Sequence, residues 1–310
     1  MVLVKGEEEH ELVGMGSKFK NTKELKVMRH NEAMASEYKA EWDKAVDEEH
    51  DRMIPPDGKK ATVWVVVKRR DIPPGEKVMK TTWTMKRKPN GKYRARINAR
   101  GYEQIDEIHF DGSSISAPVT NEFTVRVILV IGIMAGWDLE LIDMHGAFLL
   151  GPFEEDEAMY IEVPKGFEKR YKHLGDVVLQ LKRTIYGTKQ GEMAYWKEQC
   201  KAMQDMNYER SSCDPCLNFK WTDNGLNVWL SWVDDNFTGG KSEGVKQAVK
   251  EMMERFDCDH LGEMKEYLGC KIDYDKEESK IKITQLVMIQ SYEDEFDIRK
   301  GIKRITPAEP

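Results

Sequence analysis

The sequence predicts an α+β protein in which antiparallel strands pack against helices, and two kinds of pattern carry this prediction. Runs rich in Val, Ile, Thr and Trp between 62 and 100 are separated by turn residues, as in strands joined by hairpins. Segments such as 31–53 and 242–256 instead carry apolar residues at helical spacing. With 310 residues, the chain is long enough for two domains or for one large elaborated domain.

Composition and charge exclude several classes of protein. Hydrophobic residues make up 40% of the chain and charged residues 33%, which suits a folded globular protein. The longest apolar run, 123–137, contains Arg126 and is shorter than the roughly 20 residues that a bilayer span needs. No signal peptide is apparent, and five cysteines fit a reducing compartment. We therefore expect a cytoplasmic or nuclear protein that is neither secreted nor inserted in a membrane.

The first elements are expected to be a polar lead-in, one helix and a hairpin. Residues 1–30 lack periodicity, whereas 31–53 reads as a helix that Asn31 caps and that the Pro-Pro-Asp-Gly stretch at 55–58 stops. Strands follow, and the adjacent Asn and Gly at 90–91 separate two β-rich runs, which is a strong hairpin signal. The sequence thus predicts a two-stranded ribbon between about 81 and 100.

The second arm of this ribbon carries its cations on one face. Side chains alternate between the faces of a strand, so one face collects Lys92, Arg94, Arg96, Asn98 and Arg100. Between 59 and 100 the chain has fourteen basic residues against two acidic ones, a local charge of +12 on a chain of net charge −7. A solvated basic face remains an alternative on charge alone. Four cations with no acid between them favour a site for a triphosphate or a nucleic-acid backbone.

The remaining elements are predicted from periodicity and turn residues. We expect a buried helix over 121–135 that ends at Gly136, and a strand that turns into a loop over 137–149. A glycine-centred break leads into an amphipathic helix within 181–206, and 227–239 forms a hairpin. The helix 242–256 is expected to be capped by Ser242. Further strands and a short final helix complete the chain.

Three acids end two of these apolar strands. Asp234 and Asp235 follow a run rich in Val, Leu and Trp, and an acidic pair of this kind is ordinarily a solvated turn. Asp143 interrupts a second apolar strand in the same way. If the two strands lie side by side, the three carboxylates converge into a site that could hold two Mg²⁺ ions for phosphoryl transfer.

Two other candidate sites are set aside. The cysteines at 213 and 216 have metal-like spacing, but Cys258, His260 and Cys270 are too irregularly placed to complete a zinc site. His145 lies two residues after Asp143, and we assign it no catalytic role.

A series of motifs, all in the expected order, resembles the reverse transcriptase of copia-type LTR retrotransposons over roughly residues 31–307. The motifs are "EAMASEYKAEWDKAV", "KTTWTMKRKPNGKYRARINARGYEQ", "APV", "LIDMHGAFLLG", "VPKGF", "LKRTIYGTKQ", "WVDD" and "LGEMKEYLGCKI". The resemblance implies a right-hand polymerase fold with palm and fingers, a truncated thumb, and an antiparallel palm sheet packed on helices. It implies this division: 1–58 lead-in and helix; 59–125 and 150–190 fingers; 126–149 and 191–275 palm; 276–310 start of the thumb or connection.

The resemblance also implies an activity and its metal ligands. The activity is RNA-directed DNA polymerisation, in which a primer 3′-hydroxyl attacks the α-phosphate of a dNTP. Asp143 and Asp234 would be the main ligands of two Mg²⁺ ions, for which Mn²⁺ could substitute, and Asp235 would be the supporting carboxylate. The expected partners are dNTPs, an RNA or DNA template with its primer, and the integrase and RNase H parts of a longer polyprotein, which lie outside this chain.

The resemblance assigns the nucleotide-binding residues by position. Phe148 would stack under the sugar and exclude a 2′-hydroxyl. The triphosphate would be held by Arg94, Arg96 and Lys86, and Gln190 would contact the incoming nucleotide and the template.

Departures from the family pattern leave alternatives open. Trp232 stands where Tyr is usual, Asn236 follows the acids where the family is apolar, and Gly191 and Glu192 follow Gln190. One alternative is therefore a catalytically inactive remnant that binds nucleic acid through its basic fingers. Another is an unrelated palm-type enzyme such as a nucleotide cyclase, although such an enzyme would not explain the fingers segment or the "YGTKQ" motif.

Overall fold

The computed structural model describes residues 27–56, 62–88, 91–154, 157–285, 288–289 and 292. Most of the predicted lead-in, the asparagine of the hairpin turn and most of the predicted final helix lie outside these residues. The described chain is a mixed α+β structure with four separate sheets of six, four, three and two strands, which confirms the predicted class. None of its helices is long and apolar enough to cross a membrane.

The N-terminal helical segment differs from the prediction, because it forms two helices instead of one. These are α1 (His30–Met34) and α2 (Lys39–Met53). The break follows Met34, where the backbone amide and the hydroxyl of Ser36 both donate to the Ala33 carbonyl and close a turn. Asn31 lies inside α1, and the N-cap position belongs to Arg29, so the predicted cap is wrong.

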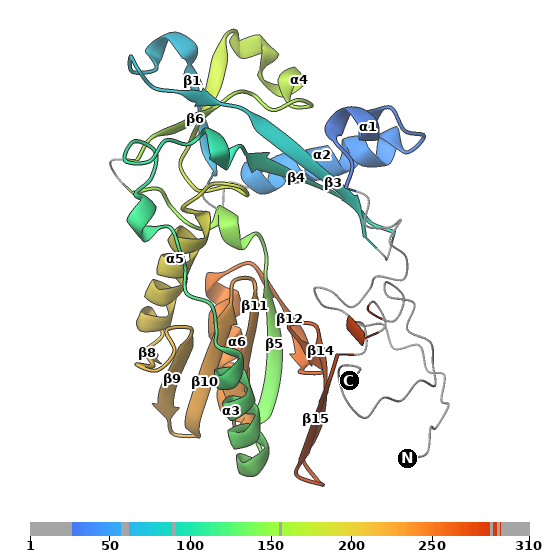
Figure 1. Ribbon diagram of the computed structural model, residues 1–310, viewed down its shortest axis with the longest axis vertical. Helices are drawn as coiled ribbons and strands as arrows, with labels where there is room; N and C mark the ends of the chain where they lie inside the picture. The colour runs from blue at the N-terminus through green and yellow to red at the C-terminus, as the bar shows by residue number, and fades with distance from the viewer. Residues whose placement is uncertain are drawn as a thin grey trace, which may run out of the picture.

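The upper part of the molecule in Figure 1 combines these helices with two sheets. One is the predicted hairpin of β3 (Thr81–Arg87) and β4 (Tyr93–Ala99), which packs against α2. The other has the order β1-β7-β6-β2 and is antiparallel except for the β2–β6 pair. Its strands are β1 (Trp64–Lys68), β2 (Val78–Met79), β6 (Met159–Ile161) and β7 (Val177–Leu181), and α4 (Glu168–Tyr171) lies nearby. Both sheets and α2 share one core of buried side chains.

The lower part is built on a six-stranded antiparallel sheet with the order β12-β5-β11-β10-β9-β8. Its strands are β5 (Asp138–Met144), β8 (Glu209–Arg210), β9 (Leu217–Thr222), β10 (Gly225–Trp232), β11 (Asp235–Gly240) and β12 (Cys258–Glu263). The predicted hairpin over 227–239 is β10 paired with β11, and β11 pairs on its other side with β5. The two strands that carry the predicted acids are therefore neighbours.

Helices and a small sheet cover the two faces of this sheet. One face packs against α5 (Gly191–Asp205) and α6 (Ser242–Arg255). The other packs against α3 (Glu122–Ala135) and against the sheet of β13 (Glu266–Tyr267), β14 (Cys270–Asp275) and β15 (Lys280–Thr284). Figure 1 shows α3 in front of the strands and α6 behind them.

Two details of these helices bear on the predictions. The helix α3 ends at Gly136 in a left-handed conformation (φ 65°), as expected, but the predicted domain boundary between 125 and 126 falls inside this helix. Ser242 is the first residue of α6 and not its cap, and its hydroxyl donates to the carboxylate of Asp138 on β5. Short 3-10 helices connect other elements: η2 (Arg69–Asp71), η3 (Gly101–Glu103), η4 (Gly112–Ser114), η5 (Ala147–Leu149) and η6 (Lys172–Leu174).

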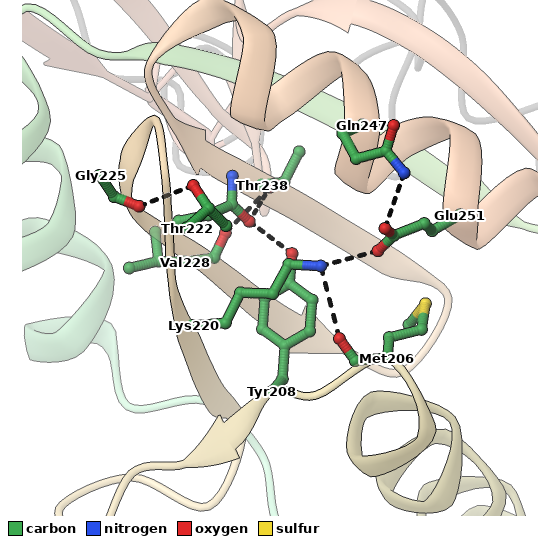
Figure 2. Close-up of polar contacts among 10 residues, drawn as sticks. Met206, Tyr208, Lys220, Thr222, Gly225, Val228, Thr238, Gln247 and Glu251 are labelled. Atoms are coloured by element: carbon green, nitrogen blue, oxygen red, sulfur yellow. Dashed lines mark hydrogen bonds and ion pairs between the residues drawn. The ribbon is translucent and has the colours of Figure 1, made fainter.

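A buried polar network holds α6 to the sheet (Figure 2). The ammonium of Lys220 on β9 pairs with Glu251 of α6 at 2.7 Å and donates to the Met206 carbonyl at 3.4 Å. The Lys220 ammonium also lies 4.6 Å from the centre of the Tyr208 ring, whose hydroxyl donates to the buried Asn227. These contacts fix the sheet against α6 and the end of α5, away from the acidic strand ends.

Candidate active site

Two of the predicted acids face each other across neighbouring strands. Asp143 of β5 stands directly opposite Asp235 of β11 in the antiparallel register. Directly opposite residues of two paired strands project from the same face of the sheet. That face also carries Leu139 and Leu141 of β5, which pack in the core beneath α3. The two apolar strands are thus neighbours, and they bring Asp143 and Asp235 to one face of the sheet.

Asp234 lies in the two-residue turn between β10 and β11, and this turn is strained and tightly held. Val233 has φ 51°, a left-handed conformation that is unfavourable for a β-branched residue. The Asp234 carbonyl accepts hydrogen bonds from the Met144 amide at 2.9 Å and from the Asn236 side chain at 3.0 Å. Asn236 is fully buried and accepts from Gln199 of α5 at 2.7 Å. The unusual Asn236 therefore anchors the acidic turn.

The acids perturb one another electrostatically. Burial, followed by repulsion from Asp234, Asp143 and Glu266, raises the pKa of Asp235 to about 6. Burial and the charge of Asp234 also raise the pKa of Asp143. Clustered carboxylates with raised pKa values are stabilised by a bound cation. Their donor atoms are all oxygens, which suits Mg²⁺ or Mn²⁺.

His145 and Asp259 join this group, and sequence reasoning did not find their place. Asp259 of β12 stands opposite Asp143 on the other side of β5. One ligand atom each from Asp143, His145 and Asp259 lies within 4.8 Å of the others. The His145 Nε2 lies 2.8 Å from a carboxylate oxygen of Asp259. Because β12 follows β5 by more than a hundred residues, no local signal could have paired them.

The basic hairpin has the two faces that alternation predicted. Ala95, Ile97 and Ala99 of β4 are buried against the core, and the cations lie on the other side. Lys86 of β3 stands directly opposite Arg94 of β4. The Arg96 guanidinium lies 4.5 Å from the centre of the Tyr186 ring, a cation–π contact. Its Nε is buried without a hydrogen-bond partner among the described residues.

The "YGTKQ" turn joins this hairpin to the lower sheet. The Ala99 amide donates to the Tyr186 carbonyl at 2.7 Å. Gly187 has φ 82°, and a Cβ there would lie 2.4 Å from the Ala99 carbonyl oxygen, so only glycine fits. Phe148, in η5, has its ring 5.6 Å from that of Tyr186. A pocket of about 560 Å³ opens here. Its lining includes Asn98, Ser116, Phe148, Tyr186, Lys189 and Glu192.

Gln190 lies in a buried hydrogen-bond network beside the "YGTKQ" turn. Its side chain is buried, donates to the His109 carbonyl at 2.8 Å and accepts from Gln104 at 2.9 Å. Gln104 also accepts from the Lys189 amide at 2.8 Å. The amide of Gln190 is thus bonded at both ends within the protein. Its predicted contact with a nucleotide stays a prediction.

Comparison with known proteins places this geometry in context. The sequence profile of the family described as reverse transcriptase (RNA-dependent DNA polymerase) matches residues 61–310. The chain is 30% identical over 244 residues to the retrovirus-related Pol polyprotein from transposon TNT 1-94 of Nicotiana tabacum, which covers 76% of this chain and 18% of that protein.

Two Pol polyproteins of Arabidopsis thaliana are also similar. Those from transposons RE2 and RE1 are each 26% identical, over 64% and 57% of this chain and 14% and 12% of their own lengths. The chain therefore spans less than a fifth of the length of each of these three polyproteins.

Proposed function

Because the chain belongs to the reverse transcriptase (RNA-dependent DNA polymerase) family, a family of nucleotidyltransferases, we propose that it extends a primer on an RNA or DNA template. The resemblance to copia-type Pol polyproteins holds over most of the chain. The upper part of the molecule would act as fingers and the six-stranded sheet as palm. The substrates would be dNTPs and a template with its primer, and integrase and RNase H would belong to the remainder of a polyprotein.

The observation that carries the proposal is the pairing of Asp143 with Asp235 beside the turn of Asp234. Asp143 and Asp234 would hold two Mg²⁺ ions, and Asp235 would support them. The ions would stabilise charge on the attacking and leaving oxygens of the transferred phosphoryl group. Burial, together with repulsion from Asp234, raises the pKa values of both Asp143 and Asp235, and a cation at this place would offset both effects.

The remaining residues bind and orient the nucleotide in this proposal. Arg94, Arg96 and Lys86, on the half-buried basic face of the hairpin, would hold the triphosphate through charge-assisted hydrogen bonds. Phe148 would lie under the sugar, where its ring leaves no space for a 2′-hydroxyl. Its partial burial against Tyr186 supports this role, because a packed ring keeps a fixed position.

The proposal is tested by primer extension on an RNA template with Mg²⁺. We expect incorporation by the wild-type chain, and loss of at least a hundredfold in rate for Asp143→Asn and Asp234→Asn, since each removes a charged metal ligand. Asp223→Asn, in the exposed turn between β9 and β10, is the matched control and should extend normally. Absence of incorporation by a chain that still binds RNA would instead support the inactive remnant.

A further inference from the structure

A buried carboxylate links α2 to the basic hairpin. Glu49 of α2 is 1% exposed. One of its oxygens accepts from the Ile97 amide of β4 at 3.2 Å, and the other accepts from the Arg52 guanidinium at 3.0 Å. Burial raises the pKa of the Glu49 carboxyl, whereas Arg52, the Ile97 amide and Arg96 lower it. Glu49 thus holds a strand edge and lies in the field of two arginines.

Arg52 reaches the loop that follows the acidic strand β5. Its side chain is 41% exposed, so the ion pair with Glu49 does not enclose the guanidinium. A Cβ built on Gly146, three residues after Asp143, would lie 3.8 Å from the Arg52 Cδ. Arg52 therefore projects from α2 to the loop that follows Asp143, from a helix to which no site residue had been assigned.

The Tyr186 ring packs against one of the two arginines and against Phe148, in the loop that follows β5. Arg96 stacks on it at 4.5 Å. Burial raises the pKa of the Tyr186 hydroxyl, and the charges of Arg96, Glu49, Arg52 and Asp234 also act on it. Of the two arginines, Arg52 pairs with the Glu49 carboxylate, whereas the Arg96 Nε is buried without a hydrogen-bond partner among the described residues. A buried carboxylate needs one cation to balance it, and the second arginine is available for an anion.

We propose that Arg52 and Arg96 form a paired arginine site, held in position by Glu49, that binds phosphate oxygens of the incoming nucleotide beside the acids. Arg52 is then a second phosphate ligand contributed by α2, and Glu49 is a positioning residue that acts through both arginines. Two guanidinium groups offer forked donors suited to adjacent phosphate groups. This inference rests on the proposed polymerase function and adds two residues to its nucleotide site.

The experiment measures anion binding and catalysis separately on the full chain. Binding of inorganic tripolyphosphate in excess Mg²⁺ is followed by calorimetry, and kcat and KM for dNTP by primer extension. Arg52→Gln should weaken tripolyphosphate binding about tenfold or more and raise KM more than it lowers kcat, since a charge-assisted hydrogen bond is lost. Arg52→Lys should recover part of the affinity, because it restores the charge without the fork.

Arg170→Gln is the matched control. Arg170 of α4 is 38% exposed, and its guanidinium pairs at 2.7 Å with Asp47, which lies on α2 as Glu49 does. Asp47 and Glu49 lie on different faces of α2, because two residues correspond to about 200° around a helix. The control therefore breaks an ion pair of α2 away from the site and should leave both measurements unchanged. Glu49→Gln should weaken tripolyphosphate binding severalfold, and if it does not fold, Arg52→Gln carries the test.

The outcomes separate this inference from the proposal on which it rests. Tripolyphosphate binding by Arg52→Gln equal to that of Arg170→Gln, together with weakened binding by Arg96→Gln, would overturn the role of Arg52 and leave the polymerase proposal intact. Unchanged tripolyphosphate binding by Arg52→Gln and by Arg96→Gln, together with no primer extension by the wild type, would overturn both this inference and the polymerase proposal.

Discussion

Replacing Asp235 by asparagine should stabilise the metal-free protein while it damages the site. The Asp235 carboxylate is half-buried and faces Asp143 across the strand pair, with Asp234 in the adjoining turn. Asparagine has nearly the same shape and carries no charge. The substitution therefore removes the cost of burying the Asp235 charge and its repulsion from Asp234 and Asp143 without opening a cavity.

The size of this effect follows from the raised pKa. Asp235 has a pKa of about 6 against its ordinary 3.8. At roughly 1.4 kcal/mol per pH unit, full ionisation of this group costs the folded state about 3 kcal/mol. Because the folded state binds the proton more tightly than the unfolded state, the penalty is absent below about pH 4, grows between pH 4 and 6, and is complete above pH 7.

Urea unfolding in EDTA at several pH values measures this prediction. The free energy of unfolding of Asp235→Asn should exceed that of the wild type by about 3 kcal/mol at pH 8 and should match it near pH 4. Excess Mg²⁺ at pH 8 should stabilise the wild type more than the variant, because bound cations relieve the same repulsion. Asp223→Asn in the exposed β9–β10 turn is the control and should follow the wild type.

A difference between Asp235→Asn and the wild type that stays constant from pH 4 to pH 8 would refute the reasoning. It would mean that burial of the Asp235 charge and its repulsion from the other acids do not determine the energetics of the site. The same result would remove the electrostatic support for a cation between β5 and β11, although it would leave the family assignment untouched.

Three further predictions concern the turn, the polar network and the sugar. Gly187→Ala should lower the free energy of unfolding by about 3 kcal/mol or more, because its Cβ meets a backbone oxygen of β4; Gly175→Ala, at a similar φ of 80° in open space, should cost about 1 kcal/mol in the same denaturation assay. Lys220→Ala should cost about 3 kcal/mol, since it leaves a partly buried carboxylate unpaired, whereas Lys246→Ala in an exposed pair of α6 should change stability by less than about 0.5 kcal/mol. Phe148→Ala should raise ribonucleotide incorporation relative to deoxynucleotide at least tenfold in primer extension, and an unchanged ratio would contradict its role under the sugar.

Local patterns predicted much of the fold because the forces behind them are local. The hairpin of β3 and β4 follows from side-chain alternation and a glycine turn, with Gly91 at φ 82°. The end of α3 follows from Gly136, which adopts a left-handed conformation at low cost. The predicted caps failed for a related reason. Asn31 and Ser242 are both suited to capping, but each lies inside its helix. The helix α1 begins before Asn31, at His30, and the Ser242 hydroxyl donates to the Asp138 carboxylate.

The residues of the site divide in the same way. Asp143, Asp234 and Asp235 could be named from the sequence because they stand at the ends of apolar runs. Burying part of a carboxylate there costs free energy unless a cation or hydrogen bonds compensate its charge. Their convergence is a matter of strand order, which no pattern along the chain specifies.

Tertiary structure alone decided which distant residues lie beside the acids, beside the hairpin and beside Gln190. Asp259 comes beside Asp143 through the pairing of β12 with β5, and Glu49 reaches the hairpin through the packing of α2. Gln190 turned inward because two protein groups satisfy its amide. The sequence by itself thus determined the family, the acids and the basic strand. Contacts between segments far apart in the chain decided the rest, because burial and charge depend on neighbours in space.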